Sequence, residues 1–249
     1  MRKILIGFLV MAAALPTMAA EPKEVIQAAI KAHGGKAALS KYPAEQYDFE
    51  GSMSIMGQEV TLSGTAMQAD GGRFRMDMEA NAGGQKVNIV QIANGKKVSF
   101  KMTAGGQDLP APEGALDELK MASVLCDVLK IYPLLDEKRF DLKAGEDADV
   151  DGKKASVIVV TAKDLSKDVT LYFDKASGRL VKENRKASGP EGKEVNQETI
   201  YSDYKEIEGV HIPMKQTVYM DGAKFMTLTS ANYKFLDKVA DATKFNVDN

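Results

Sequence analysis

The sequence predicts a mainly β protein (α+β), in which one curved antiparallel sheet holds a single long apolar helix in its hollow. Three observations support this fold class. From residue 45 onward, apolar residues recur with a period of two in about a dozen segments bounded by Gly, Asn and Asp turns. Between residues 45 and 235, a single segment has the pattern of a long helix. Strands and helices do not alternate, and no internal repeat or linker divides the chain.

The start of the chain has the pattern of a secretory signal peptide. Two basic residues open it, an apolar run spans residues 4–15, and small residues precede an expected cleavage after Ala19 or Ala20. No cysteine follows the run, so a lipid-attachment site is missing. We therefore expect a periplasmic protein with residues 1–20 as signal peptide and residues 21–249 as a single domain. An uncleaved leader that serves as an anchor is the alternative.

The composition limits the class of protein. The chain has 33 Lys and Arg against 35 Asp and Glu, a formal net charge of −2, so nothing in it points to nucleic acid as a partner. Its single cysteine, Cys126, excludes an internal disulfide, and the apolar neighbours of Cys126 favour a buried, unreactive thiol. The 13 methionines either fill gaps in the core or line a surface that adapts to variable apolar shapes.

The predicted elements begin with a helix at residues 21–32. Gly34 and Gly35 follow it, which makes His33 a helix-end residue rather than a ligand or a catalytic group. A short helical turn at residues 36–40 comes next. From residue 45 the period changes to two, and five antiparallel strands form a meander with one apolar and one charged face. These strands are expected at residues 45–55, 59–66, 73–79, 87–92 and 98–102.

A loop at residues 104–112 leads into the helix on which the prediction depends, Pro112–Tyr132, with Pro133 expected to end it. One narrow arc of the helical wheel collects its polar residues Lys120, Ser123, Asp127 and Lys130. Apolar side chains spread over roughly 240° of the remaining circumference. A surface helix needs an apolar stripe of only about 100°, and the charges exclude a transmembrane span of ~20 mostly apolar residues. We therefore expect this lid or plug helix to be buried on several sides.

The strands resume after this helix. Residues 155–162 are apolar on both faces, which predicts a central strand, and residues 187–193 form a loop. The other strands are expected at residues 140–142, 169–173, 180–186, 195–204, 211–220 and 223–235. A sheet of about 11–12 neighbour-paired strands with one apolar face will curl. Its concave side must then be filled by side chains, by the helix or by a ligand.

Several short motifs occur in a fixed order along the chain. They are Phe74-Arg75-Met76, Asn94-Gly95-Lys96, Leu171-Tyr172-Phe173-Asp174 with Ser177-Gly178-Arg179-Leu180, Tyr204 followed by Gly209-Val210-His211-Ile212-Pro213, and Phe245. Together they resemble the lipoprotein-carrier superfamily, the LolA/LolB-like exported proteins of outer-membrane lipoprotein sorting. The resemblance covers nearly all of the chain after the leader. It implies an incomplete antiparallel barrel (a half-barrel) with helices over its open side and a hollow that accepts acyl chains or other apolar groups.

One segment departs from the pattern of that superfamily. LolA carriers have an Arg-Pro pair just before the aromatic-Arg strand, and this Arg engages the lid. In this chain the same place reads Ala69-Asp70-Gly71-Gly72. The resemblance therefore favours a relative that binds another lipid over the lipoprotein chaperone itself.

The candidate ligand-binding residues are the apolar side chains expected to face the hollow, and a plain core position is the alternative for each. They are Phe49, Met53, Leu62, Phe74, Met76, Met78, Ile89, Phe100, Met102, Leu119, Met121, Leu125, Val128, Leu129, Val157, Val159, Leu171 and Phe173. Arg75 alternates to the outer face, so it is not a candidate.

The sequence offers little for catalysis or for a metal. Two His and one Cys are too few for a usual zinc site. Residues 147–152 begin like a calcium loop, Asp-x-Asp-x-Asp-Gly, but Ile158 stands where the bidentate Glu should be, which favours a solvated hairpin turn. No Ser or Cys nucleophile is marked out beside His211. We therefore expect no enzymatic activity, no catalytic residue, no metal and no cofactor.

Two functions fit these predictions. The first is a periplasmic protein that binds or carries a lipid, or an acylated protein, between donor and acceptor proteins of the envelope. The second is an envelope sensor or interaction module of the same fold, whose hollow is filled by its own helix. A cavity of at least about 300 Å³ would favour the first function, and a packed interior would favour the second. Hydrolysis through His211 is a residual third reading.

Overall fold

The structure of the protein is a computed structural model. It describes the chain apart from residues 1–20, 56, 166, 190–191, 240 and 248–249. The predicted signal peptide therefore lies outside the described residues.

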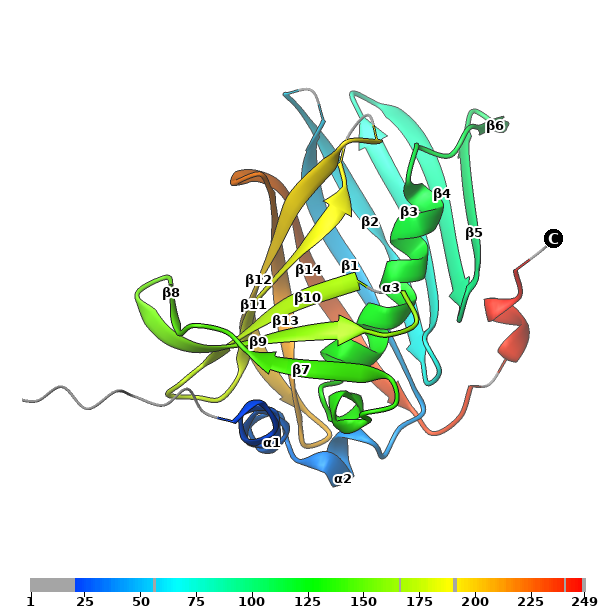
Figure 1. Cartoon of the computed structure of the whole chain (residues 1–249). Helices are drawn as coiled ribbons and strands as arrows, with labels where there is room; N and C mark the ends of the chain where they lie inside the picture. The colour runs from blue at the N-terminus through cyan, green and yellow to red at the C-terminus, as the bar shows by residue number, and fades with distance from the viewer. Residues whose placement is uncertain (1–20, 56, 166, 190–191, 240, 248–249) are drawn as a thin grey trace, which may run out of the picture.

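One antiparallel sheet bends around a helix and forms an open half-barrel (Figure 1). Its 14 strands follow the order β6-β5-β4-β3-β2-β1-β14-β13-β12-β11-β10-β9-β7, and β8 pairs with β9. The strands are β1 (Ala44–Ile55), β2 (Gln58–Ala69), β3 (Arg73–Ala82), β4 (Gln85–Asn94), β5 (Lys97–Ala104), β6 (Gln107–Leu109), β7 (Phe140–Ala144), β8 (Ala148–Val150), β9 (Lys153–Ala162), β10 (Lys167–Asp174), β11 (Leu180–Ser188), β12 (Glu194–Ile207), β13 (Val210–Met220) and β14 (Ala223–Leu236). The mainly β, half-barrel prediction is confirmed. The predicted strand number missed β6 and β8, because three-residue strands are too short to show a period of two.

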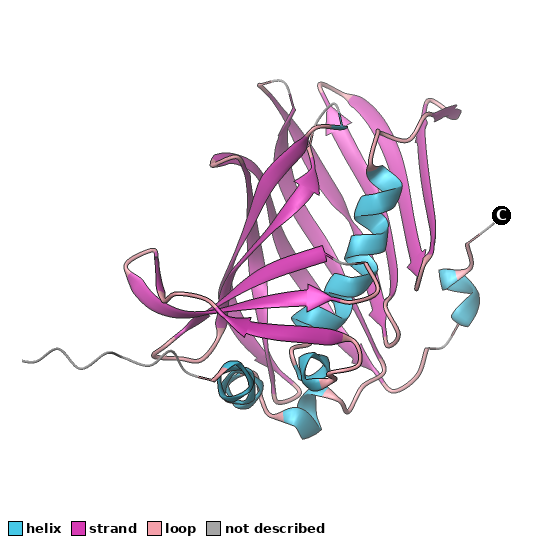
Figure 2. Cartoon of the chain, in the orientation of Figure 1, coloured by secondary structure: helices cyan, strands magenta, loops and turns pink. Residues whose placement is uncertain are grey.

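Helices occupy the hollow and one end of the half-barrel, and a C-terminal helical turn lies on its outside (Figure 2). They are α1 (Pro22–Ala32), α2 (Lys36–Leu39) and α3 (Ala115–Leu129), with 3₁₀ turns η1 (Tyr132–Leu135) and η3 (Ala242–Phe245). The helix α3 crosses the concave face of the sheet, while α1, α2 and η1 lie together at one end. Among the described residues, no helix is both long and apolar enough to cross a membrane.

The helix α3 is shorter than predicted. It ends at Leu129, and Ile131 takes a φ of 63° before the 3₁₀ turn begins. Pro133 therefore lies inside η1 and does not itself end α3. The predicted range of residues 112–132 was too long at both ends. At the start, Gly114 has a φ of 77° and α3 begins only at Ala115. At the end, apolar side chains continue past the point where the backbone leaves the helix.

The burial of α3 on several sides is confirmed. Leu119 and Cys126 pack with Phe74 on the first half of the sheet. Met121 and Val128 belong to the large core cluster that contains Leu171 on the second half. Because α3 contacts both halves, it joins the two sides of an open sheet.

The alternation of faces along the meander follows the predicted period of two. Phe49 of β1 lies opposite Gly64 of β2, and both belong to the concave face. Arg75 lies on the outer face, as expected, where its guanidinium is 2.6 Å from the Asp77 carboxylate and donates to the Lys244 carbonyl. The C-terminal segment is thereby held against the outside of the sheet.

Two predicted hollow-facing residues lie on the other face of their strand. Leu171 of β10 is opposite Ile158 of β9, whereas Val157 and Val159 are opposite Tyr172 and Thr170. The inward residues of β9 are therefore Ile158 and Val160, which are fully buried in the core cluster. The choice of Val157 and Val159 was wrong because β9 is apolar on both faces, so its sequence does not mark the inward one.

Candidate functional site

The hollow contains a cavity of about 100 Å³ between the C-terminal end of α3 and strands β1, β12, β13 and β14. His33 at the end of α1 and Leu39 of α2 close it from the end of the half-barrel. Much of its wall is aromatic. The aromatic lining residues are Tyr42, Tyr47, Tyr201, Tyr204, Tyr233 and Phe235. We call this space the aromatic cavity.

The rings on one side of the aromatic cavity pack against each other. Tyr47 stacks on Tyr233 with 5.1 Å between ring centroids, and Tyr42 stacks on Phe235 at the same distance. Tyr233 also meets Phe235 edge to face at 5.5 Å. These contacts give the cavity a rigid wall with few rotamers left to order on binding.

Glu45, the second residue of β1, brings a carboxyl group to this wall. Burial away from bulk water raises the pKa of Glu45, while the Lys130 ammonium and a hydrogen bond from Tyr233 act in the opposite direction. The Lys130 amine itself donates to Asp70 at 2.6 Å, from a side chain that is 11% exposed. The lining of the cavity therefore includes the Glu45 carboxyl and the Lys130 ammonium, and Asp70 pairs with Lys130 from a half-exposed side chain.

Further along the same strands, the concave face becomes purely apolar. The buried residues Val60, Leu62 and Ala80 form its base, and half-buried side chains lie on it. Those half-buried residues are Met53, Met78, Ala82, Val87, Ile89, Met226 and Leu228. We call this set the apolar floor. On this face of the sheet, β1 and β14 pair through Phe49 and Ser230, Gly51 and Leu228, and Met53 and Met226. The apolar floor and the aromatic cavity are therefore adjacent along one face of β1 and β14.

The polar arc of α3 contacts the turn between β2 and β3 instead of solvent. The Ser123 hydroxyl donates to the Gly72 carbonyl at 2.6 Å, and Lys130 pairs with Asp70 in the same turn. Gly72 has a φ of 69°, and a Cβ there would lie 2.5 Å from the Ser123 Oγ, so the close approach requires glycine. Arg139 completes the set with an ion pair to the buried Asp127 at 2.5 Å.

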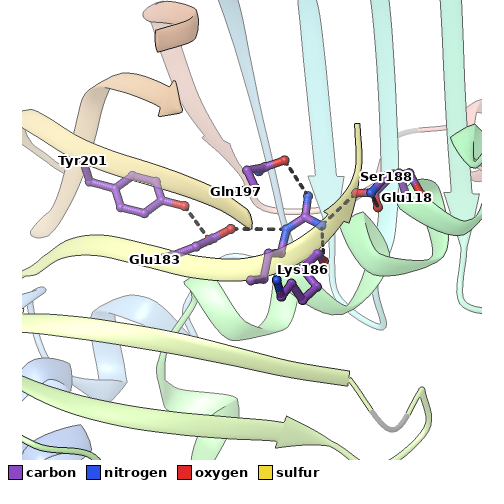
Figure 3. A network of polar contacts seen from close by, with 7 residues as sticks. Glu118, Glu183, Lys186, Ser188, Gln197 and Tyr201 are labelled. Atoms are coloured by element: carbon purple, nitrogen blue, oxygen red, sulfur yellow. Dashed lines mark hydrogen bonds and ion pairs between the residues drawn. The ribbon is translucent and has the colours of Figure 1, made fainter. Parts of the chain in front are cut away.

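The start of α3 is tied to the opposite half of the sheet by a buried polar network (Figure 3). Glu118 of α3 accepts hydrogen bonds from the Arg185 guanidinium at 2.8 Å and from the Ser188 backbone N–H at 2.7 Å. Figure 3 shows Glu183 of β11 between Tyr201 and the centre of this network, and the Tyr201 hydroxyl donates to it at 2.8 Å. Burial raises the pKa of Glu183, and the Arg185 charge opposes that shift.

The structure distributes the predicted lining residues over several clusters. The apolar floor contains Met53, Leu62, Met78 and Ile89. The cluster between α3 and the first half of the sheet contains Phe74, Met76, Phe100 and Leu119. The large core cluster contains Met121, Leu125, Val128, Leu129, Leu171 and Phe173. Phe49 is buried on β1, and Met102 is half-buried on β5. Of the predicted residues, all of which the structure describes, Leu129 alone lines the aromatic cavity.

Tyr204 and Tyr233 were missed in the sequence because the backbone changes the alternation where they stand. Glu45 and Tyr47 follow the regular alternation of β1 with Phe49, but as polar side chains they were not chosen as lining residues. Asn232 has a φ of 50°, and the pairing of β1 with β14 shifts register beside it, which turns Tyr233 inward. Asp203 with a φ of 55° precedes Tyr204 in the same way. Asn and Asp tolerate this backbone region, so their presence one residue before a strand tyrosine was the available signal.

Two other sequence features have structural partners of their own. In the Asp-rich hairpin, Asp149 accepts from the Gly152 backbone N–H at 2.7 Å and Asp147 pairs with Lys175 at 2.5 Å, as in a solvated turn. No group of three potential metal ligands occurs among the described residues. His211 lines the aromatic cavity beside Arg179, whose guanidinium is 3.3 Å from its ring.

Comparison with solved structures identifies the fold of this chain, whereas comparison with family models and curated proteins finds no relative. No protein-family model matches the chain, and no curated protein matches it. Among solved structures, a LolA superfamily protein from Nitrosomonas europaea has a TM-score of 0.57 at 11% identity, covering 87% of this chain and 94% of its own. A DUF1329 family protein from Desulfovibrio piger has a TM-score of 0.53 at 14% identity, over 90% and 97% of the two chains. An outer membrane lipoprotein-sorting protein domain from Vibrio parahaemolyticus has a TM-score of 0.52 at 10% identity, over 91% and 97%.

The chain therefore has the fold of LolA superfamily proteins, which confirms the resemblance seen in its motifs. At these identities the likeness concerns the fold alone. The turn that departs from the LolA pattern still holds the helix in this chain, through the Asp70 carboxylate and the Gly72 carbonyl.

The first prediction concerns Arg185. Arg185→Met should lower the free energy of unfolding by about 3–5 kcal/mol, because it leaves the buried Glu183 without its ion partner. Lys186→Met is the matched control on the same strand, where the side chain is 62% exposed and the change should stay within about 0.5 kcal/mol. Urea unfolding measures both. Equal stability of the two variants would show that the network does not stabilise the fold.

The second prediction concerns pH. Burial lowers the pKa of His33 from 6.5 to about 4, and the buried ring is held neutral with Nδ1 donating to the Ala29 carbonyl. Between these values the unfolded chain binds a proton that the folded chain does not, so stability falls as pH falls. This contribution should cost about 3 kcal/mol between pH 7.5 and pH 4. Urea unfolding of wild type and His33→Gln over this range should show a difference in stability that shrinks by that amount, and a constant difference would contradict it.

Proposed function

We propose that this protein binds an amphipathic lipid in the hollow of its half-barrel, within the cell envelope, and that it acts as a lipid or lipoprotein carrier without catalysing a reaction. The observation that carries the proposal is the continuity of the apolar floor with the aromatic cavity on one face of β1 and β14. The leader-like residues 1–20 support export to the periplasm. The shared fold with an outer membrane lipoprotein-sorting protein domain supports a role in the envelope.

The apolar floor would supply the driving force for binding. Met53, Met78 and Met226 are half-buried there, so each exposes apolar surface to the hollow. Every CH₂ group of a ligand that leaves water contributes about 0.8 kcal/mol. Methionine side chains adjust to chains of different shape, which suits a carrier that takes more than one lipid.

The dimensions of the hollow suit one extended chain with its headgroup. Glu45 and Met53 lie on the same face of β1, eight residues apart, which corresponds to about 26 Å at ~3.3 Å per residue. The acyl chains of one membrane leaflet span about 15 Å, half of a hydrocarbon core of ~30 Å. The aromatic cavity alone, at about 100 Å³, is smaller than the about 300 Å³ of usual ligand pockets. The chain would therefore lie on the apolar floor, with α3 shifting to cover it.

A second function, an envelope sensor or interaction module that carries no lipid, is favoured by the way α3 is held. Polar contacts fix its start through Glu118, its middle through Ser123 and its last turn through Asp127. A helix fixed along its whole length fills the hollow instead of opening it. The two functions differ in one measurable property, which is whether the protein takes up a lipophilic molecule.

The third prediction tests uptake directly. Leu228→Asp should weaken binding of a fluorescent fatty acyl probe by about tenfold or more, because a carboxylate on the apolar floor must be desolvated when the chain binds. Thr229→Asp is the matched control, since Thr229 is the exposed neighbour on the same strand and points to the outer face. Fluorescence titration of wild type and both variants gives the three dissociation constants.

Organic extraction and mass spectrometry of protein purified from its native host should recover a lipid from wild type and less from Leu228→Asp. No recovered lipid together with no probe uptake by wild type would reject the carrier function and leave the sensor function. Equal binding by Leu228→Asp and Thr229→Asp would show that the ligand lies elsewhere.

A further inference from the structure

We infer that the end of the half-barrel at which α3 begins is a docking surface for a lipid bilayer, and that a lipid passes there between the bilayer and the apolar floor. The docking depends only on the surface itself, whereas the passage of a lipid rests on the proposed function. Three features of this end support the inference, namely its exposed apolar side chains, its hairpin turns and its continuity with the apolar floor.

Three large apolar side chains are exposed among the described residues, and all three lie at this end. Ile55 ends β1 and is 45% exposed, Leu109 ends β6 and is 38% exposed, and Leu116 in the first turn of α3 is 47% exposed. The end of β1, the short strand β6 and the start of α3 are together at the top of Figure 1. Single exposed apolar residues are ordinary, but their collection at one end marks an interaction site. We call these three residues the apolar rim.

The hairpin turns at the apolar rim lack charged residues, unlike the turns at the other end of the same strands. The β1–β2, β3–β4 and β5–β6 turns at residues 55–58, 82–85 and 104–107 read Ile-Met-Gly-Gln, Ala-Gly-Gly-Gln and Ala-Gly-Gly-Gln. The β2–β3 and β4–β5 turns at the opposite end read Asp-Gly-Gly-Arg at residues 70–73 and Asn-Gly-Lys-Lys at residues 94–97. Charged groups are the most costly to remove from water. Uncharged turns therefore suit a surface that enters the interface of a bilayer.

The charged residues next to these turns lie on the outer face of the sheet. Glu59 and Asp108 each alternate with a strand neighbour that faces the hollow, so both point outward. Lys86 is also on the outer face, where it forms an ion pair with Glu79 at 2.9 Å. A partner that covers the apolar rim is therefore held by burial of apolar surface and not by ion pairs, which favours a bilayer over a charged protein surface.

Charges on the second half of the sheet mark the limit of the docking surface. Asp221 in the β13–β14 turn accepts a hydrogen bond from the Asn196 backbone N–H at 2.9 Å. On α3, Asp117 forms an ion pair with Lys120 at 2.8 Å, one turn further from the rim. We therefore restrict the docking surface to strands β1–β6 and the first turn of α3.

The apolar rim continues the apolar floor. Ile55 lies on the same face of β1 as Met53 of the floor, two residues further along the strand. Leu109 is opposite Met102, and Met102 is opposite Ile89 of the floor. An alkyl chain that leaves the floor at this end therefore meets apolar side chains before it meets water. A bilayer in contact with the rim could supply or receive such a chain without exposing it.

The fourth prediction concerns vesicle binding. Wild type should float with phosphatidylcholine vesicles in low and in high salt, because burial of the apolar rim needs no anionic lipid. Ile55→Ser, Leu109→Ser and Leu116→Ser combined should lower the partition constant by about tenfold or more, because the apolar surface that enters the bilayer is lost. The matched control replaces the same three residues by Met, which keeps the apolar surface, and it should bind as wild type does.

Two further measurements separate the docking from the proposed function. The triple Ser variant should still take up the fluorescent acyl probe in the absence of vesicles, because its apolar floor is unchanged. Leu228→Asp, in which uptake of the probe should be weakened, should still float with the vesicles. Vesicle binding by a wild type that takes up no probe would confirm the docking surface and reject the passage of a lipid.

A wild type that does not bind phosphatidylcholine vesicles would overturn the inference and leave the proposed function standing, as would equal binding by the Ser and Met variants. Binding that needs anionic lipid and disappears in high salt would also overturn it, because charge and not the apolar rim would then hold the protein. So would a wild-type dimer that binds no vesicles and that the Ser variant does not form, since a second copy would then cover the rim.

Discussion

An apolar concave face that an open sheet cannot cover by itself is the constraint on which the rest of this structure depends. The ends of the strand order, β6 and β7, do not meet, so the inner faces of two sheet halves remain open to one side. The helix α3 covers part of that face by packing Leu119 on one half and Val128 on the other. What α3 leaves uncovered is the apolar floor and the aromatic cavity, and these two regions define what the protein can bind.

Apolar packing gives α3 its stability, and polar contacts give it its position. Packing of apolar surface is non-directional, so it does not choose between neighbouring positions of a helix in a smooth hollow. The hydrogen bond from Ser123 to Gly72 and the ion pair from Glu118 to Arg185 exist in one position only. Buried ion pairs add little net stability over an apolar replacement but are costly to break. We therefore interpret these contacts as the restraint that a ligand must overcome if α3 moves.

Much of this architecture could be read from the sequence, and the limits of that reading are physical. The period of two gave the meander and the outward position of Arg75, because alternation alone decides the face of a half-buried strand. The same rule failed at Val157 and Val159, where both faces of β9 are apolar. It also failed at Tyr204 and Tyr233, where a left-handed residue changes which side chain turns inward.

The motif order indicated the fold, which solved structures confirm. The aromatic cavity could not be predicted in this way, because it is formed by strands far apart in sequence and by the C-terminal end of α1. The end of α3 was misplaced because Ile131 leaves the helix with an apolar side chain.

The most direct test of the central claim is a crystal structure of the protein purified from its native host. The account predicts elongated electron density on Met226 and Leu228, continuing to the aromatic cavity beside Glu45, with α3 displaced from the Ser123 and Gly72 contact. Void-free packing of α3 against the floor, with the Ser123 contact intact and no foreign density in the hollow, would contradict it.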